Sequence, residues 1–182
     1  NKSLSKNVII GLNHYVKQLP SIIGENSLEN KPYKLNNIFT EAQNITWEDT
    51  VKKINDEYEI YKGKSFKIIN GLDYRRTPPT LVCRNAVYPN TFETAYNQVD
   101  SEIKGVIDMH TFVSFVSAAP NYGKHRDNQV VLIVQAIGSI KYDVSGIDQV
   151  TLNPGEALYI PKFIDHKPII TGPRVTLSFR LE

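Results

Sequence analysis

The sequence contains almost no cysteine and no long apolar run. Of its 182 residues only Cys83 is a cysteine, so the chain can form neither an internal disulfide nor a Cys-x-x-Cys zinc site. We therefore expect a reducing, cytoplasmic location. Cys83 follows two apolar residues, which favours a buried, inert thiol over a nucleophile. No stretch reaches the roughly 20 apolar residues of a membrane-spanning helix, and no membrane partner is expected.

An excess of charge of one sign is also missing. The chain carries 21 basic and 19 acidic residues, a net charge of +2, and the basic residues are scattered. This balance does not indicate a nucleic-acid-binding protein. Hydrophobic residues make up 41% and charged residues 22% of the chain, which is the composition of an ordinary globular protein.

No internal repeat divides the chain, but its two halves differ in pattern. Residues 1–77 mix helical and strand signals, including a predicted helix over 8–19 and a predicted strand over 65–69. We expect them to form an extension that packs on the core. Residues 78–182 are richer in strand patterns and are predicted to form that core, so that the whole chain makes a single compact domain.

A second helix of the first half has a recognisable start. Thr46 is a plausible N-cap, and Asp49 lies three residues further on. Val51, Ile54 and Tyr58 follow at helical spacing. The sequence therefore predicts a helix that begins just after Thr46.

The second half predicts one more helix and then a series of short strands. The helix covers 91–103, with Phe92, Tyr96 and Val99 on one face. Apolar runs separated by turn residues follow it, and short strands at such spacing indicate a β-sandwich or barrel. The predicted strands are 111–118, 130–137, 140–144, 156–160 and 174–181.

Three residues of this half form a candidate metal site. His125 and Asp127 lie two positions apart, and on a strand such residues point to the same face. His166 follows a predicted strand and is the natural third ligand. Two imidazoles and one carboxylate form the facial triad of non-haem Fe(II) oxygenases, which leaves positions open for a 2-oxo acid and O2. Each residue taken alone is more often an ordinary surface group, so the prediction depends on the three together.

The last predicted strand alternates strictly between apolar and polar residues. The apolar face should pack on the core. The polar face either meets solvent or lines a polar cavity, and its proximity to His166 favours the cavity. An arginine there suits a dicarboxylate, because guanidinium pairs bidentately with a carboxylate. The polar residues are Arg174, Thr176, Ser178 and Arg180.

Two segments carry a family resemblance. Residues 124–138 resemble the His-x-Asp, apolar run and Gln-x-x-Gly of the JmjC-like (cupin-like) 2-oxoglutarate oxygenases, and residues 153–166 resemble their Pro-Gly-Asp-x-Leu-Tyr-x-Pro…His segment. The resemblance implies a double-stranded β-helix core with flanking helices. It implies that His125, Asp127 and His166 bind Fe(II) and are the catalytic centre. The implied reaction converts 2-oxoglutarate and O2 to succinate and CO2, with hydroxylation or demethylation of a protein, peptide or amino-acid substrate.

The residue that would anchor 2-oxoglutarate departs from the usual pattern. JmjC-like enzymes place a Lys or Arg two residues after the glycine of the first segment. Here that position is Ile140 and the cation follows at Lys141, a step that reverses the face of a strand. Prolyl- and aspartyl-hydroxylase-like members use an arginine on the last strand, which Arg174 resembles. We therefore predict that Arg174 anchors 2-oxoglutarate, with Lys141 as the alternative anchor. Ser178 and Tyr122 are predicted to be further contacts to the co-substrate.

Two other classes of function stay open from the sequence. One is a cupin-type metalloprotein that does not use 2-oxoglutarate, although the His-x-His and Glu of ordinary cupins are missing here. The other is a binding module that keeps the fold without activity. The complete His-x-Asp…His set favours the oxygenase over both.

Overall fold

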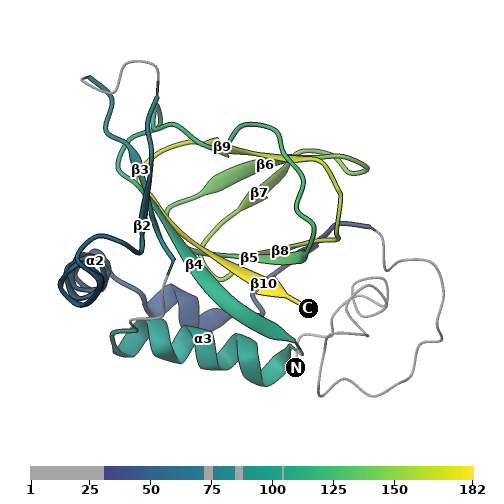
Figure 1. Ribbon diagram of the computed structural model, residues 1–182. Coiled ribbons are helices and arrows are strands. Elements are labelled where there is room, and N and C mark those ends of the chain that lie inside the picture. Colours follow the sequence, from purple (N-terminus) through teal and green to yellow (C-terminus); the bar gives the residue numbers. More distant parts are fainter. Residues whose placement is uncertain (1–30, 72–75, 85–87, 104) are drawn as a thin grey trace.

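The chain forms two antiparallel β-sheets with flanking helices, and the computed structural model describes residues 31–71, 76–84, 88–103 and 105–182 (Figure 1). In order across the larger sheet, its seven strands are β1 (Tyr33–Leu35), β8 (Ala157–Ile160), β5 (Val130–Ile137), β10 (Arg174–Leu181), β4 (Val106–Ser114), β3 (Thr80–Cys83) and β2 (Phe66–Ile69). The smaller sheet contains β7 (Val150–Leu152), β6 (Ile140–Val144) and β9 (His166–Ile170). The helices are the 3-10 helix η1 (Thr40–Asn44), α2 (Trp47–Tyr61) and α3 (Asn90–Glu102).

The larger sheet has a helical layer on one face and the smaller sheet on the other (Figure 1). β10 lies at its centre, between β5 and β4. The apolar face of β10 packs in the main core with residues of α3 and η1, among them Phe92 and Ala42. A second apolar cluster fills part of the space between the two sheets, where Ile133 and Leu158 meet Ile140. The polar face of β10 therefore points towards the space between the sheets.

The predicted fold class is confirmed, and most strand predictions agree with the structure. β5, β6 and β10 have the predicted bounds, and the predicted helix over 91–103 is α3. The predicted strand over 111–118 was wrong at both ends, because β4 runs from Val106 to Ser114. Phe115 lies beyond the end of β4 with 43% of its surface exposed, so the apolar letters after Ser114 do not continue the strand.

The helix predicted after Thr46 is present with the expected cap. The Thr46 hydroxyl accepts the Asp49 backbone N–H at 3.1 Å, and the Asp49 carboxylate accepts the Thr46 backbone N–H at 2.9 Å. The two residues thus form a capping box. The apolar residues that indicated the helix do not all lie on its buried face, because Val51 and Tyr58 are 60% and 53% exposed.

The buried face of α2 instead contains a charged pair. The Lys53 ammonium lies 3.4 Å from the Glu57 carboxylate, and the side chains are 1% and 0% exposed. The ammonium also lies 5.5 Å from the ring centroid of Phe92. Cys83 is buried nearby, and burial raises the pKa of its thiol to about 12, with a further contribution from Glu57. This agrees with the inert thiol that we expected.

The first half of the chain contributes strands to the main sheet. β1 pairs with β8 at one edge, and β2 pairs with β3 at the other. β2 covers most of the strand predicted over 65–69. The helix predicted over 8–19 lies outside the described residues. No helix in the described ranges is long and apolar enough to cross a membrane.

Candidate metal and co-substrate site

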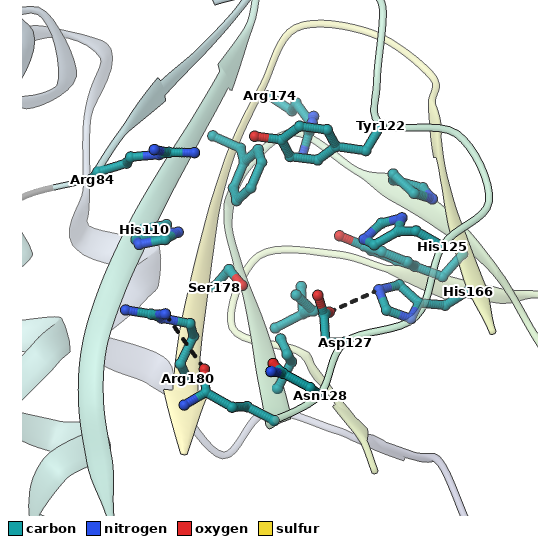
Figure 2. A pocket seen from close by; sticks show the side chains of 16 residues that line it. Arg84, His110, Tyr122, His125, Asp127, Asn128, His166, Arg174, Ser178 and Arg180 are labelled. Carbon is teal, nitrogen blue, oxygen red and sulfur yellow. Dashed lines mark hydrogen bonds and ion pairs between the residues drawn. The ribbon is translucent and has the colours of Figure 1, made fainter. Parts of the chain in front are cut away.

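The three predicted metal ligands come together between the sheets (Figure 2). One ligand atom from each of His125, Asp127 and His166 lies within 4.8 Å of the other two. The distance from His166 Nε2 to Asp127 Oδ2 is 3.5 Å. Ligand atoms at these separations can converge on a single ion.

The backbone that holds the ligands is not the regular strand that the sequence indicated. His125 forms an isolated bridge with His166, in which each N–H donates to the other carbonyl at 3.0 and 2.8 Å. The Phe163 N–H donates to the Asp127 carbonyl at 2.7 Å. Two segments that are distant in the sequence are thereby aligned side by side, and the side chains of His125 and Asp127 still face the same region.

Both imidazoles are oriented by backbone carbonyl groups. His125 Nδ1 lies 3.0 Å from the Gly123 carbonyl oxygen, and His166 Nδ1 lies 3.0 Å from the Ile164 carbonyl oxygen. A carbonyl only accepts hydrogen bonds, so each Nδ1 carries the proton and each Nε2 keeps its lone pair. Hydrogen bonds of this kind fix the tautomer of metal-binding histidines.

The charge state of the site also suits a divalent cation. Burial lowers the pKa of His166, and the neighbouring His125 adds to this effect. The imidazole therefore stays neutral, as a ligand must. Two neutral nitrogen donors and one carboxylate, with room on one side, match the donor set of non-haem iron. These residues fit Fe(II) chemically.

The triad borders a cavity of about 430 Å³ between the two sheets. Its walls come from β4, β5, β6, β9 and β10, together with the segment that precedes β5. Figure 2 shows the triad on one side of the cavity and Arg174, Ser178 and Arg180 along the other. A volume of this size accommodates more than a metal ion.

Arg174 lies in this cavity and is almost completely buried. Its side chain is 2% exposed, and its guanidinium donates to the hydroxyls of Ser114 at 3.2 Å and Thr176 at 2.8 Å. The guanidinium carbon also lies 5.8 Å from the centroid of the Phe112 ring. Among the residues that the structure describes, no carboxylate lies within ion-pair distance of Arg174.

A polar network fixes the position of Arg174. The Thr176 hydroxyl donates to Gln135 Oε1 at 2.7 Å, and the Gln135 amide donates to the carbonyls of Ile137 and Gly138 at 2.7 and 3.1 Å. Gly138 has a φ of +68° and lies against the Pro173 carbonyl, where a Cβ would clash. The Gln-x-x-Gly segment thus supports the strand end that carries the arginine.

The other predicted co-substrate residues differ in position. Ser178 lines the cavity at 9% exposure, and Tyr122 lines its edge, 37% exposed, with its ring edge-on to His125. Lys141 is exposed and pairs with Thr151 and Ile169 in the smaller sheet, outside the cavity lining. The strand-face reasoning that preferred Arg174 is consistent with this geometry.

Sequence reasoning missed three titratable residues of the cavity wall, which are Arg84, His110 and Tyr142. They come from the segment after β3, from β4 and from β6, and strand pairing brings them to the cavity. The register Cys83↔Thr111 places Arg84, the residue that follows β3, beside His110 of β4. A correct prediction of the bounds of β4 would have indicated His110. Asp108 was missed as well, and it lies beside the cavity, 3.6 Å from His110.

Comparisons with known proteins identify the fold. No family model matches the sequence, and no curated protein matches it. The structure of the ribosomal oxygenase YcfD from Escherichia coli in complex with cobalt and 2-oxoglutarate matches with a TM-score of 0.59 and 16% identity, over 84% of this chain and 48% of that chain. Another crystal structure of the same enzyme gives a TM-score of 0.60 at 16% identity, with the same coverage of both chains.

The chain therefore spans about half the length of these YcfD structures. At this identity the likeness establishes the architecture. The resemblance expected from the two sequence segments is confirmed at the level of the fold: the chain has the β-helix architecture of the JmjC-like and cupin-like 2-oxoglutarate oxygenases.

Proposed function

We propose that the protein is an Fe(II)- and 2-oxoglutarate-dependent oxygenase that hydroxylates a protein, peptide or amino-acid substrate. One observation carries the proposal. The buried guanidinium of Arg174, which has no carboxylate partner within the described part of the chain, faces the same cavity as a His-Asp-His set. Burying a cation without an anion is costly, so Arg174 is suited to a ligand that brings the anion with it.

Each part of the cavity has a distinct task in this reaction. His125, Asp127 and His166 would hold the iron through two Nε2 atoms and a carboxylate oxygen. Arg174 would bind the carboxylate of 2-oxoglutarate that lies far from the metal. The bound iron, together with O2 and 2-oxoglutarate, supplies the oxidising chemistry that yields succinate, CO2 and a hydroxylated substrate.

Tyr142 is suited to assist Arg174. It is 4% exposed, lines the cavity, and burial raises the pKa of its phenol to about 12. The phenol therefore keeps its proton at neutral pH and can donate a hydrogen bond to a carboxylate. Apolar side chains such as Ile133 and Phe112 complete the wall and exclude water from the bound acid.

The structural comparison supports the same reaction class. The matching enzyme is described as a ribosomal oxygenase and was solved with cobalt and 2-oxoglutarate bound. This favours a co-substrate of that kind for the present chain. A cupin-type metalloprotein without 2-oxoglutarate would leave the buried guanidinium of Arg174 without an anion.

Anaerobic calorimetry with Fe(II) and 2-oxoglutarate tests the proposal directly. We expect 2-oxoglutarate to bind when Fe(II) is present and succinate to form once O2 is admitted. Asp127→Ala should abolish both, because the metal loses its anionic protein ligand. Asp143→Ala is the matched control, since it removes an exposed carboxylate of β6. Succinate formation by Asp127→Ala at the wild-type rate would contradict the assignment of the triad.

A further inference from the structure

The cavity has a second basic region further along β10 from Arg174. Figure 2 shows Arg84, His110 and Arg180 along the wall that faces the triad. The β4–β10 register explains the arrangement, because it places His110 opposite Ser178 and Asp108 opposite Arg180. Three basic side chains, from β4, β10 and the segment just after β3, thus line one side of the cavity.

One small diacid bound at Arg174 leaves this region free. The β3–β4 and β4–β10 registers place the backbone of Arg84 level with Ser178. Ser178 and Arg180 lie four and six residues from Arg174 on β10, which is about 13 and about 20 Å at a rise of about 3.3 Å per residue. A five-carbon 2-oxo acid would use one carboxylate at Arg174 and the other at the metal, so Arg84 stays available for another molecule.

The cations of this region differ in how they are paired. Arg180 is neutralised by Asp108, to which it donates two hydrogen bonds, one of them from Nε at 2.6 Å. The Asp108 carboxylate also lies 3.6 Å from His110 Nε2. Arg84 lines the cavity, and in the described residues no carboxylate lies within ion-pair distance of its guanidinium. Among the described residues, Arg84 is therefore the cation of this region that has no carboxylate partner.

The position of Arg84 is set by a buried group. Its backbone N–H donates to Glu57 Oε1 at 3.1 Å, and Glu57 is 0% exposed. The same carboxylate pairs with Lys53, so α2 anchors the end of β3. The side chain of Arg84 thus extends towards the cavity from a fixed backbone position (Figure 2).

The charge of the cavity favours an acidic substrate. Three arginines and two aspartates line or border it, which leaves a net charge of +1 when the histidines are neutral. Fe(II) adds two positive charges and 2-oxoglutarate adds two negative ones, so the loaded cavity keeps the same excess. This excess lies at Arg84, whereas Asp108 is already occupied by Arg180. A cationic substrate would meet repulsion here.

We propose that the prime substrate carries a carboxylate, and that Arg84 binds this carboxylate opposite the metal triad. The inference rests on the proposed function, because it takes the triad as the reacting centre. The carboxylate belongs either to an acidic side chain or to the α-carboxyl group of an amino acid. Arg84 is then a specificity residue that orients a C–H bond of the substrate towards the triad.

Paramagnetic line broadening tests this assignment without turnover. The protein is loaded with Mn(II) and saturating 2-oxoglutarate, and proton signals of three probes are compared. N-acetyl-aspartate N-methylamide has only a side-chain carboxylate, N-acetyl-alanine has only an α-carboxylate, and N-acetyl-asparagine N-methylamide has none. We expect at least one carboxylate probe to broaden well beyond the neutral probe, and the broadened probe identifies the source of the carboxylate.

Two variants decide whether Arg84 is responsible. Arg84→Gln should lower the affinity of the broadened probe by about tenfold, the usual effect of losing one charge-assisted partner. Lys64→Gln removes an exposed cation outside the cavity lining and should leave the broadening unchanged. Equal broadening of the neutral probe, or no effect of Arg84→Gln, would overturn the assignment.

The 2-oxoglutarate signals separate this inference from the proposed function. If they broaden while the carboxylate probes show no preference, the role of Arg84 is wrong and the oxygenase proposal stands. If 2-oxoglutarate itself does not broaden with Mn(II) bound, both proposals fail.

Discussion

Each end of β10 carries an arginine, and the two arginines differ in burial and in their partners. Arg174 is 2% exposed and has hydroxyl partners, whereas Arg180 has a 40% exposed side chain and a carboxylate partner in Asp108. Both residues lie on the polar face of one strand and line one cavity. Arg174 has no carboxylate partner among the described residues and can bind an anionic ligand, whereas Arg180 is already paired with Asp108.

The first way to sharpen this comparison is to remove Arg174. Loss of a desolvated charge partner commonly costs about 2–5 kcal/mol, so Arg174→Gln should raise the 2-oxoglutarate requirement by well over tenfold. Lys141→Gln should have little effect, because Lys141 is exposed outside the cavity. Titration of succinate formation against 2-oxoglutarate measures both. The opposite ranking would move the anchor to Lys141.

A second change disturbs the Arg174 end without touching the cavity. Gly138→Ala places a Cβ against the Pro173 carbonyl. The backbone φ at this position is +68°, a value that residues with a side chain rarely adopt. We expect a loss of about 2 kcal/mol in the free energy of unfolding, from left-handed strain and from the clash. Thermal unfolding measures this loss. Gly146→Ala is the comparison variant, because that glycine also has positive φ but meets nothing within 4 Å of an added Cβ. Equal destabilisation by the two variants would show that strain alone matters.

The Arg180 end should tolerate change better. Asp108→Asn weakens a partly exposed ion pair, and such pairs contribute less than about 1 kcal/mol to stability. The 2-oxoglutarate requirement should stay within about twofold of wild type, because distant sites act independently. Denaturant unfolding and the succinate assay test the two expectations. A tenfold change in the requirement would mean that the two ends are coupled.

The smallest expected effect is a shift in the titration of His110. Burial lowers the pKa of His110 below its ordinary value of 6.5, and Arg180 lowers it further while Asp108 raises it. Arg180→Gln should therefore raise this pKa, which an NMR titration of the imidazole would detect. The unfolded chain binds this proton more tightly than the folded one, so the contribution of His110 to stability is lost as pH falls below about 6.5. A lower pKa in Arg180→Gln would contradict this account.

Strict alternation of apolar and polar residues allowed β10 to be predicted from the sequence alone. In β10, apolar residues alternate with Arg174, Thr176, Ser178 and Arg180, and the structure buries one face in the core and turns the other to the cavity. The His-x-Asp…His spacing likewise brought three residues together. Both patterns are local, or belong to a recurring family arrangement, and need no knowledge of strand order.

Features that depend on which segments pack together could not be predicted from the sequence. The apolar residues Val51 and Tyr58 of α2 are exposed, whereas the helix buries Lys53 and Glu57, which form an ion pair. Arg84 carries no local signal at all, since its place beside the cavity follows from the β3–β4 register. Propensity and periodicity describe one segment at a time, whereas these positions depend on which segments meet.

The reciprocal hydrogen bonds between His125 and His166 have a consequence for the topology of the chain. These residues bracket β5, β6, β7 and β8, so an ion held by both imidazoles would close this stretch into a ring. Such a closure restricts the unfolded chain much as a disulfide does, but it can be reversed by a chelator. In a protein with one cysteine, the metal would then serve as a removable cross-link between β9 and the segment that precedes β5.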